Sequence, residues 1–186
     1  MKKIFDLLLA TLVLVIFSVP MVLIGMAIRL TSKGPALFWS ERIGKNNKII
    51  KMPKFRSMRI DTPAVAKHLL VNPDGFLSPI GGFLRSTSLD ELPQIFLVLM
   101  GDMSLVGPRP ALFNQHDLIA LRSKKGVDKL LPGITGWAQI NGRDDLSILD
   151  KALLDEEYMN CQSFWFDIKI LYMTFFKVIK KDGVSH

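Results

Sequence analysis

The stretch Arg85–Pro110, RSTSLDELPQIFLVLMGDMSLVGPRP, carries two adjacent carboxylates, Asp90 and Glu91, at the start of an apolar run. The run predicts a helix from Ser88 to Met100. Ser88 and Glu91 have the spacing of a capping box, in which each side chain bonds a backbone N–H at the helix start. Acids there also offset the helix dipole. Helix capping alone could therefore account for both carboxylates.

The surroundings of the pair favour a second interpretation. Arg85, Arg109 and Arg143 lie before and after it, and an arginine fork suits phosphate oxygens. Neighbouring helix positions point roughly 100° apart, so one carboxylate can face a reacting phosphorus while the other meets a metal or a proton. The chain has neither a P-loop nor a GxGxxG motif. The sequence therefore predicts phosphate chemistry outside the standard nucleotide folds.

Composition indicates one domain in contact with a membrane. The chain has 186 residues, of which 49% are hydrophobic, and its mean hydropathy is +0.28. Its one cysteine, Cys161, excludes an internal disulfide and favours a reducing compartment. The three histidines have no metal-ligand spacing.

The net charge of +7 is concentrated in one segment. Residues 29–59 contain nine Lys and Arg residues against a single acid, Glu41. Such a block suits anionic lipid headgroups, phosphate-bearing substrates or nucleic acid. A solvated basic hairpin is the alternative.

The N-terminal run Ile4–Ile28 is long enough for a membrane helix, rising roughly 37 Å if straight. Pro20 interrupts it, and the arm before Pro20 would rise only about 24 Å, too little to cross a bilayer alone. Lysine or arginine flanks both ends, so the positive-inside rule gives no orientation. A hairpin that enters and leaves on the same face satisfies both flanks. A single span with a tolerated proline remains open, and the run is too long for a signal peptide.

The rest of the chain alternates short elements with glycine- and proline-rich loops. Ala36–Ile43 and Lys48–Met52 predict two strands around a turn at 44–47. We expect a loop at Val71–Gly82. Further helices are predicted at Asp61–Leu70, Ala111–Ser123 and Ser147–Cys161.

The last predicted helix, Phe164–Lys181, is apolar and aromatic. Its polar residues Asp167, Thr174 and Lys177 share one face with Lys181. Such a helix suits a bilayer surface, and a core helix of the domain fits equally well.

Four motifs carry a family resemblance that covers essentially the whole chain in order. They are KFRSM at 54–58, RSTSLDELPQ at 85–94, GDMSLVGPRP at 101–110 and PGITGWAQINGR at 132–143. They closely resemble the bacterial sugar transferases, and more narrowly the small monotopic phosphoglycosyl transferases. The resemblance implies a mostly helical α+β fold, with interfacial amphipathic helices and a small β-hairpin. It also implies a re-entrant membrane helix at 1–30 and a cytosolic, membrane-associated catalytic domain at 31–186.

The implied activity moves sugar-1-phosphate from a UDP-sugar onto polyprenyl (undecaprenyl) phosphate and releases UMP. An N-acetylated amino sugar is the expected cargo. Asp90 would attack the sugar-bearing phosphorus to form a covalent intermediate that the lipid phosphate resolves. The expected place is the cytoplasmic face of a bacterial inner membrane, with downstream glycosyltransferases as partners and no nucleic acid.

The resemblance also implies roles for individual residues. Mg²⁺ would lie beside Asp90 and Glu91, with Glu91 handling metal or proton. The residues expected to bind substrate or phosphate are Lys54, Arg56, Arg85, Gly107, Pro108, Arg109, Pro110, Gln139, Arg143 and Asp155. Ser18 and Pro20 would break the membrane helix. Many relatives have Ser immediately before that proline, whereas here Val19 intervenes.

A non-enzymatic alternative remains for the chain as a whole. A basic membrane-surface module with a single span would explain the charged segment and the two apolar ends. It would not explain an Asp-Glu pair among arginines.

Overall fold

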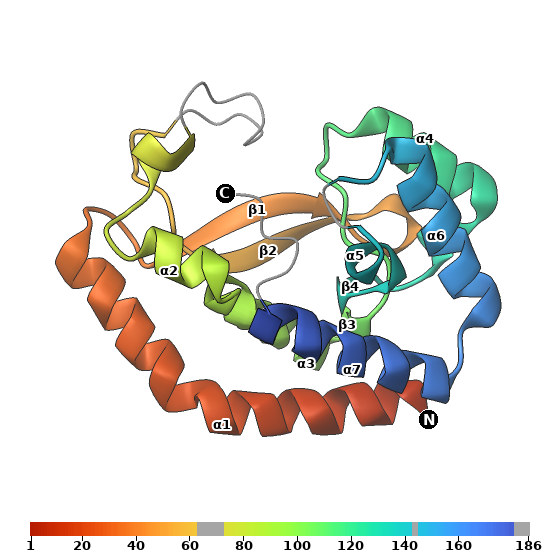
Figure 1. Cartoon of the computed structure of the whole chain (residues 1–186), viewed down its shortest axis with the longest axis horizontal. Coiled ribbons are helices and arrows are strands. Elements are labelled where there is room, and N and C mark those ends of the chain that lie inside the picture. The colour runs from red at the N-terminus through yellow and green to blue at the C-terminus, as the bar shows by residue number, and fades with distance from the viewer. Residues whose placement is uncertain (63–72, 143–144, 181–186) are drawn as a thin grey trace.

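The computed structural model describes residues 1–62, 73–142 and 145–180 as a mostly helical α+β arrangement (Figure 1). This confirms the fold class expected from the sequence. The helices are α1 Lys2–Thr31, α2 Gly81–Ser86, α3 Ile95–Met100, α4 His116–Lys125, α5 Trp137–Ile140, α6 Ile148–Cys161 and α7 Phe164–Lys180. Short 3-10 helices lie at Lys45–Asn47, Pro73–Phe76, Leu89–Gln94 and Val127–Lys129. Most of the helix expected at Asp61–Leu70 lies outside the described residues.

The predicted hairpin is confirmed. Strands β1 (Leu37–Ile43) and β2 (Ile49–Phe55) pair antiparallel, from Leu37 opposite Phe55 to Ile43 opposite Ile49. The turn between them holds Asn46 and Asn47 at positive φ, which asparagine tolerates better than most residues. β2 continues past the predicted end at Met52, because Pro53 and Lys54 remain paired with β1. This extension places Lys54 within the strand.

The long helix predicted from Ser88 is wrong in its first half. Leu89–Gln94 forms a 3-10 helix with Pro93 inside it, and the α-helix begins only at Ile95. Ser88 adopts left-handed backbone angles (φ 56°) and its side chain caps nothing. An N-cap residue normally has extended angles, so the predicted capping box does not form. The carboxylate of Glu91 instead accepts hydrogen bonds from Lys54 and Arg109.

A second, parallel pair of strands was not predicted. Ser104–Val106 (β3) pairs with Gly133–Thr135 (β4). Three-residue strands are too short to show a period in the sequence. Glycines permit the close approach, since a Cβ on Gly133 or Gly136 would lie 2.1 Å from the backbone of Gly107.

Helix α1 runs along one edge of the molecule and bends partway along its length (Figure 1). It contains Pro20, which cannot donate the helical hydrogen bond and is a usual cause of such a bend. Among the described residues, α1 is the one helix long and apolar enough to cross a membrane. Both halves nevertheless contact the rest of the chain: Ala10 is buried in the main core, and Ile28 in a second cluster with Phe55 and Leu84.

Two further predicted helices are present, one of them with a later start. α4 starts at His116 rather than Ala111, because the backbone of Ala111 accepts a hydrogen bond from Ile43 N at the end of β1. α6 begins as predicted, with Ser147 accepting a hydrogen bond from Asp150 N as its N-cap. The loop expected at Val71–Gly82 ends in the short helix α2, which starts at Gly81.

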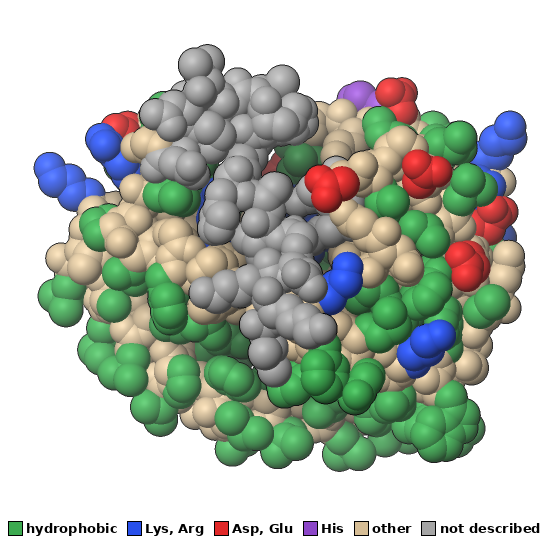
Figure 2. Space-filling model, viewed as in Figure 1, with side chains coloured by type: hydrophobic (Ala, Val, Ile, Leu, Met, Phe, Trp, Pro, Cys, Tyr) green, Lys and Arg blue, Asp and Glu red, His purple; other side chains and the backbone are tan. Residues whose placement is uncertain are grey.

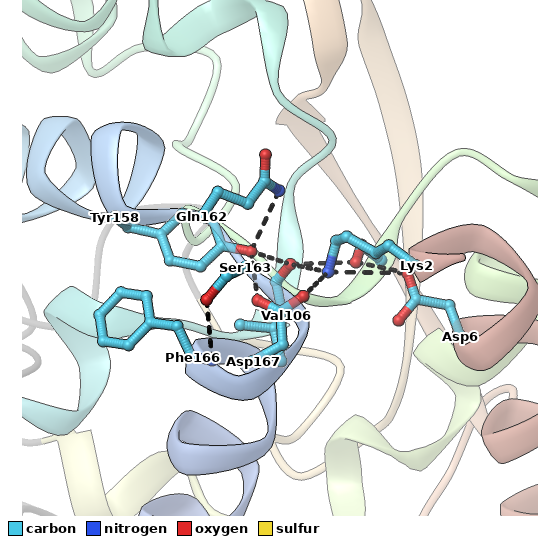
Figure 3. A network of polar contacts seen from close by, with 9 residues as sticks. Lys2, Asp6, Val106, Tyr158, Gln162, Ser163, Phe166 and Asp167 are labelled. Atoms are coloured by element: carbon cyan, nitrogen blue, oxygen red, sulfur yellow. Dashed lines mark hydrogen bonds and ion pairs between the residues drawn. The ribbon is translucent and has the colours of Figure 1, made fainter.

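The polar face of α7 points into the protein. Asp167 accepts hydrogen bonds from Lys2 and Tyr158 in the network of Figure 3, and Thr174 bonds Thr135. Burial, followed by the contact with Asp167, raises the pKa of Tyr158. Phe166 packs on the core, but the other aromatic side chains of α7 are exposed, Trp165 to 77%. α7 therefore has a mixed buried side and an unusually apolar exposed side for a helix packed on a water-soluble domain.

Candidate active site

Glu91 is held between two cations that come from distant parts of the chain. Its Oε1 lies 2.7 Å from Nζ of Lys54 on β2 and 2.8 Å from Nη2 of Arg109. Nη1 of Arg109 lies 3.5 Å from the other carboxylate oxygen. β2 and the 3-10 helix at Leu89–Gln94 pack against each other, and this packing brings Lys54 to Glu91. The predicted site residues Lys54, Glu91 and Arg109 are therefore in direct contact.

Asp90 has a different environment. It is 9% exposed, and its carboxylate receives no hydrogen bond or ion pair from residues 1–62, 73–142 or 145–180. Lys54, Glu91, Arg85 and Arg109 all lie close enough to affect its titration. Two adjacent acids thus have separate situations, one fixed by cations and one available to react.

Burial and the neighbouring charges together set the pKa directions of Asp90, Glu91 and Lys54. It raises the pKa of Asp90, and the Glu91 carboxylate adds to this, while Lys54, Arg85 and Arg109 oppose it. Burial would also raise the pKa of Glu91, but the charges of Arg109 and Lys54 hold it well below its ordinary value. Burial lowers the pKa of Lys54, and Glu91 opposes that change. Opposite shifts on neighbouring carboxyls are typical of sites that assign them separate roles.

The loop at 107–110 is fixed by backbone contacts. Gly107 N donates to Thr135 O at 2.9 Å, and Gly133 N donates to Pro108 O at 2.9 Å. Arg42 Nη1 lies 3.4 Å from Pro110 O. The loop is thus built against β4, and Arg109 projects from a rigid base toward Glu91.

Arg122 is part of this support, and the sequence analysis did not identify it. Its Nη1 donates to the carbonyl of Arg109 at 2.8 Å, and its Nη2 and Nε donate to Oδ2 of Asp155 at 2.6 and 2.9 Å. Asp155, predicted to bind substrate, is 1% exposed and lies behind Arg109. Arg122 looks in the sequence like an ordinary cation in the last turn of a helix, so no local signal marks it.

The other predicted residues lie at varied distances from the pair. Arg85 donates to Ser57 Oγ at 2.9 Å and is close enough to Asp90 to lower its pKa. Arg56 lies at the end of β2, where its Nη1 is buried with no hydrogen-bond partner among the described residues. Gln139 lines the same cavity as Glu91 and Arg109. Arg143 lies outside the described residues.

The protein can supply only a few carboxylate ligands to a metal ion at this site. Among the described residues, no group of three Asp, Glu, His or Cys side chains could hold an ion. Asp90 offers a carboxylate without a partner there, whereas Glu91 already contacts two cations. Mg²⁺ commonly takes one or two carboxylates and completes its shell with water and substrate phosphates. One carboxylate beside a diphosphate fits that pattern.

Comparison with known proteins gives a consistent result. Residues 1–181 match the family model described as bacterial sugar transferase. The chain is 43% identical, over 95% of its length, to the UDP-glucose:undecaprenyl-phosphate glucose-1-phosphate transferase of Escherichia coli, and covers 40% of that protein. It is 35% identical over 98% of its length to the undecaprenyl-phosphate galactose phosphotransferase of Salmonella typhimurium, covering 41% of it.

A relative of similar size also matches. This relative is EpsL of Bacillus subtilis, described as an uncharacterized sugar transferase. It is 39% identical over the whole chain, and the chain covers 90% of its length. The chain therefore spans about two fifths of the longer relatives and nearly all of the shorter one.

Proposed function

Since the chain belongs to the bacterial sugar transferase family, we propose that it is a phosphoglycosyl transferase. It moves sugar-1-phosphate from a UDP-sugar to polyprenyl phosphate and releases UMP. The names of the E. coli and Salmonella relatives give undecaprenyl phosphate as their acceptor and glucose or galactose as their cargo. We keep an N-acetylated amino sugar as the prediction for this chain.

Asp90 is the nucleophile in this proposal. One carboxylate oxygen attacks the sugar-bearing phosphorus, the bond to the bridging oxygen breaks, and UMP leaves with that oxygen. The acyl phosphate on Asp90 is then attacked by an oxygen of polyprenyl phosphate, which forms the lipid diphosphate sugar and frees the carboxylate. In the part of the chain that the structure describes, the Asp90 carboxylate has no partner, which suits this role because a nucleophile must reach its target without first breaking an ion pair.

Glu91 and its two cations prepare the electrostatics of the site. The ion pairs fix Arg109 and Lys54 where negative charge gathers during transfer. Arg122 and Asp155 hold the backbone of Arg109 from behind. Mg²⁺ would be held by Asp90 and the diphosphate, and when bound it would neutralise phosphate charge. Glu91 would need to release one of its cations to ligate the ion.

We further propose that α1 is re-entrant and does not cross the bilayer. Asp6 near its start bonds Ser104, and Ile28 near its end packs on Phe55, so both ends attach to the unit that carries Asp90. A straight span would carry one end to the opposite side of the bilayer. Ser18 donates to Val15 O at 2.9 Å just before Pro20, so a hydroxyl lies at the bend despite the shifted position.

The face along α1 supports this placement. Figure 2 shows hydrophobic side chains gathered along the lower rim of the molecule, over α1. With the aromatic outer side of α7, this rim would lie in the interface of a bacterial inner membrane. Residues 1–30 are then a membrane anchor and 31–186 a catalytic domain on the cytoplasmic face. The lipid product would pass to downstream glycosyltransferases.

One observation carries the proposal: the Asp90 carboxylate has no partner among the described residues, whereas its neighbour Glu91 is paired with Lys54 and Arg109. The test is transfer by the purified full chain in detergent, with Mg²⁺, polyprenyl phosphate and separate UDP-sugars that include glucose, galactose and N-acetylated hexosamines. We expect UMP and a lipid-linked sugar in equal amounts with at least one donor, and neither in the presence of a chelator. A basic binding module would give no product with any donor, which would reject the proposal.

A further inference from the structure

A cavity of about 290 Å³ adjoins the Glu91–Arg109 ion pair. Its polar end is formed by Glu91, Arg109 and Gln139, and most of its remaining wall is apolar, including Leu105 and Ile134. Asp90 does not line the cavity, but its immediate neighbour does. The site chemistry described above thus accounts for one end of this space only.

Part of the cavity wall comes from α1 and α7. Val13 of α1 and Thr174, Lys177 and Val178 of α7 line it. These two helices also carry many of the exposed apolar side chains, such as Leu12 and Phe175. The cavity therefore lies between the reacting groups and the face that we assign to the bilayer.

Two polar groups in the wall have no partner in the described part of the chain. The side-chain amide of Gln139 is buried without a hydrogen bond at either atom. Lys177 lines the cavity, and its ammonium makes no hydrogen bond or ion pair with residues 1–62, 73–142 or 145–180. A buried amide without a partner is costly, and a cation in the wall of the same cavity favours an anion with acceptor oxygens. The wall therefore complements an anionic head attached to an apolar tail.

We propose that this cavity binds the phosphate end of the isoprenoid acceptor, with Lys177 as its phosphate-binding cation and Gln139 as a second donor. The inference rests on the proposed function. The first isoprene units would lie against Val13 and Ile134, and the rest of the tail would continue into the bilayer. A uridine would leave its many polar groups facing apolar wall, so the nucleotide half of the donor belongs elsewhere.

A chain of hydrogen bonds joins α7, at Thr174, to the loop that carries Arg109. Thr174 donates its hydroxyl hydrogen to Ile170 O at 2.8 Å, so Thr135 must be the donor in the 2.7 Å contact between the two threonines. The carbonyl of Thr135 in turn accepts from Gly107 N. Lys177 lies one turn after Thr174, so its position on α7 is fixed relative to Arg109.

Measuring the two half-reactions separately distinguishes a failure of this proposal from a failure of the proposed function. Adduct formation from UDP-sugar without lipid tests the donor half, and transfer from the preformed adduct to an isoprenyl monophosphate tests the acceptor half. Both are followed by rapid quenching in a neutral detergent that contains no anionic phospholipid. Lys177→Met should raise the acceptor concentration for half-maximal transfer by about tenfold or more, because a charge-assisted hydrogen bond is lost. Adduct formation should stay within about twofold of the wild-type rate.

Two variants on the same position and helix serve as controls. Lys177→Arg should restore most of the acceptor affinity. Lys169→Met removes an equal charge from the exposed side of α7, where Lys169 lies over the Trp137 ring, and should leave both halves unchanged. An equal effect of Lys169→Met would show that Lys177 acts only through surface charge. A loss confined to adduct formation would place the donor in the cavity. Either result overturns the proposal.

Val13→Phe tests the apolar part of the cavity independently of charge. The larger side chain should fill the space and weaken acceptor use while adducts still form, and adduct formation itself reports a folded site. Normal acceptor use by Val13→Phe would contradict a tail beside α1. If the wild-type protein forms no adduct and transfers no sugar, the proposed function fails first, which is a separate result.

Discussion

The ammonium nitrogen of Lys2 lies 2.6 Å from Oδ2 of Asp167, so the first turn of α1 is tied to the first turn of α7 (Figure 3). Lys2 also donates to Val106 O at 3.1 Å, one residue before the loop that carries Arg109. Asp6 accepts from Ser104 at 2.7 Å within the same network. The start of α1 is therefore attached to the base of the loop that carries Arg109.

Asp167→Ala should destabilise the protein by roughly 3 kcal/mol, because Lys2 loses its short ion pair and the buried Tyr158 hydroxyl loses its carboxylate acceptor. Chemical denaturation in detergent, followed by tryptophan fluorescence, measures the change. Asp61→Ala is the control, since its pair with Arg59 is exposed and should contribute at most about 1 kcal/mol. Equal losses in the two variants would mean that the network has no special role.

The re-entrant path of α1 predicts that both of its ends face the cytoplasm. Cysteines placed at Lys3 and, separately, at Lys33 in a Cys161→Ser background should react with a membrane-impermeant maleimide only in inside-out vesicles. Cys161 is exposed and must be removed to clear the background. If one position reacts only in right-side-out vesicles, α1 spans the bilayer and the single-span alternative is correct.

Glu91→Ala should lower stability by about 3 kcal/mol or more, because Lys54 and Arg109 are left as uncompensated charges in a buried site. Glu91→Gln should lose less, since its amide oxygen can still accept one hydrogen bond. The matched control is Glu156→Ala, which removes the more exposed pair with Lys125 and should cost at most about 1 kcal/mol. A Glu91→Ala variant as stable as wild type would show that the ion pairs do not hold the site together.

The rate of adduct formation should fall on acidification with a midpoint above about 3.9, the ordinary pKa of aspartate. The sign follows from the mechanism: Asp90 attacks as the carboxylate, burial raises its pKa, and the reactive form is lost as pH falls through that raised value. Glu91 stays ionised over this range, because its pKa is held well below its usual value. Single-turnover rates across pH, with recovery after return to neutral pH, measure this. A midpoint at or below the ordinary value would contradict a buried nucleophile.

Much of the fold was predictable because its signals are local. The hairpin, α6 with its Ser147 cap, and the apolar length of α1 all follow from periodicity, turn residues and composition. The predictions are wrong where contacts between distant segments determine the local structure. Pro93 and the left-handed Ser88 replace a capped α-helix with a 3-10 turn, and this rearrangement is stabilised by Lys54 and Arg109 from other segments.

The proximity of several candidate site residues was predictable from the sequence, but the contacts between them were not. Lys54, Glu91 and Arg109 were expected near one another, yet only the folded chain shows that Glu91 joins the other two. Arg122 and Lys177 carry no motif, and their positions depend on how α4 and α7 pack. Side chains that act from a helix face toward a distant loop leave no spacing pattern in the sequence.

The mass of the intact protein after incubation with Mg²⁺ and UDP-sugars, in the absence of lipid acceptor, tests the central claim most directly. Wild type should gain the mass of one sugar phosphate with a matching release of UMP. Asp90→Asn should gain none while keeping the wild-type unfolding midpoint, because the amide preserves the shape but cannot attack phosphorus. An adduct on Asp90→Asn, or wild-type turnover that releases UMP only when polyprenyl phosphate is present, would contradict the covalent role of Asp90.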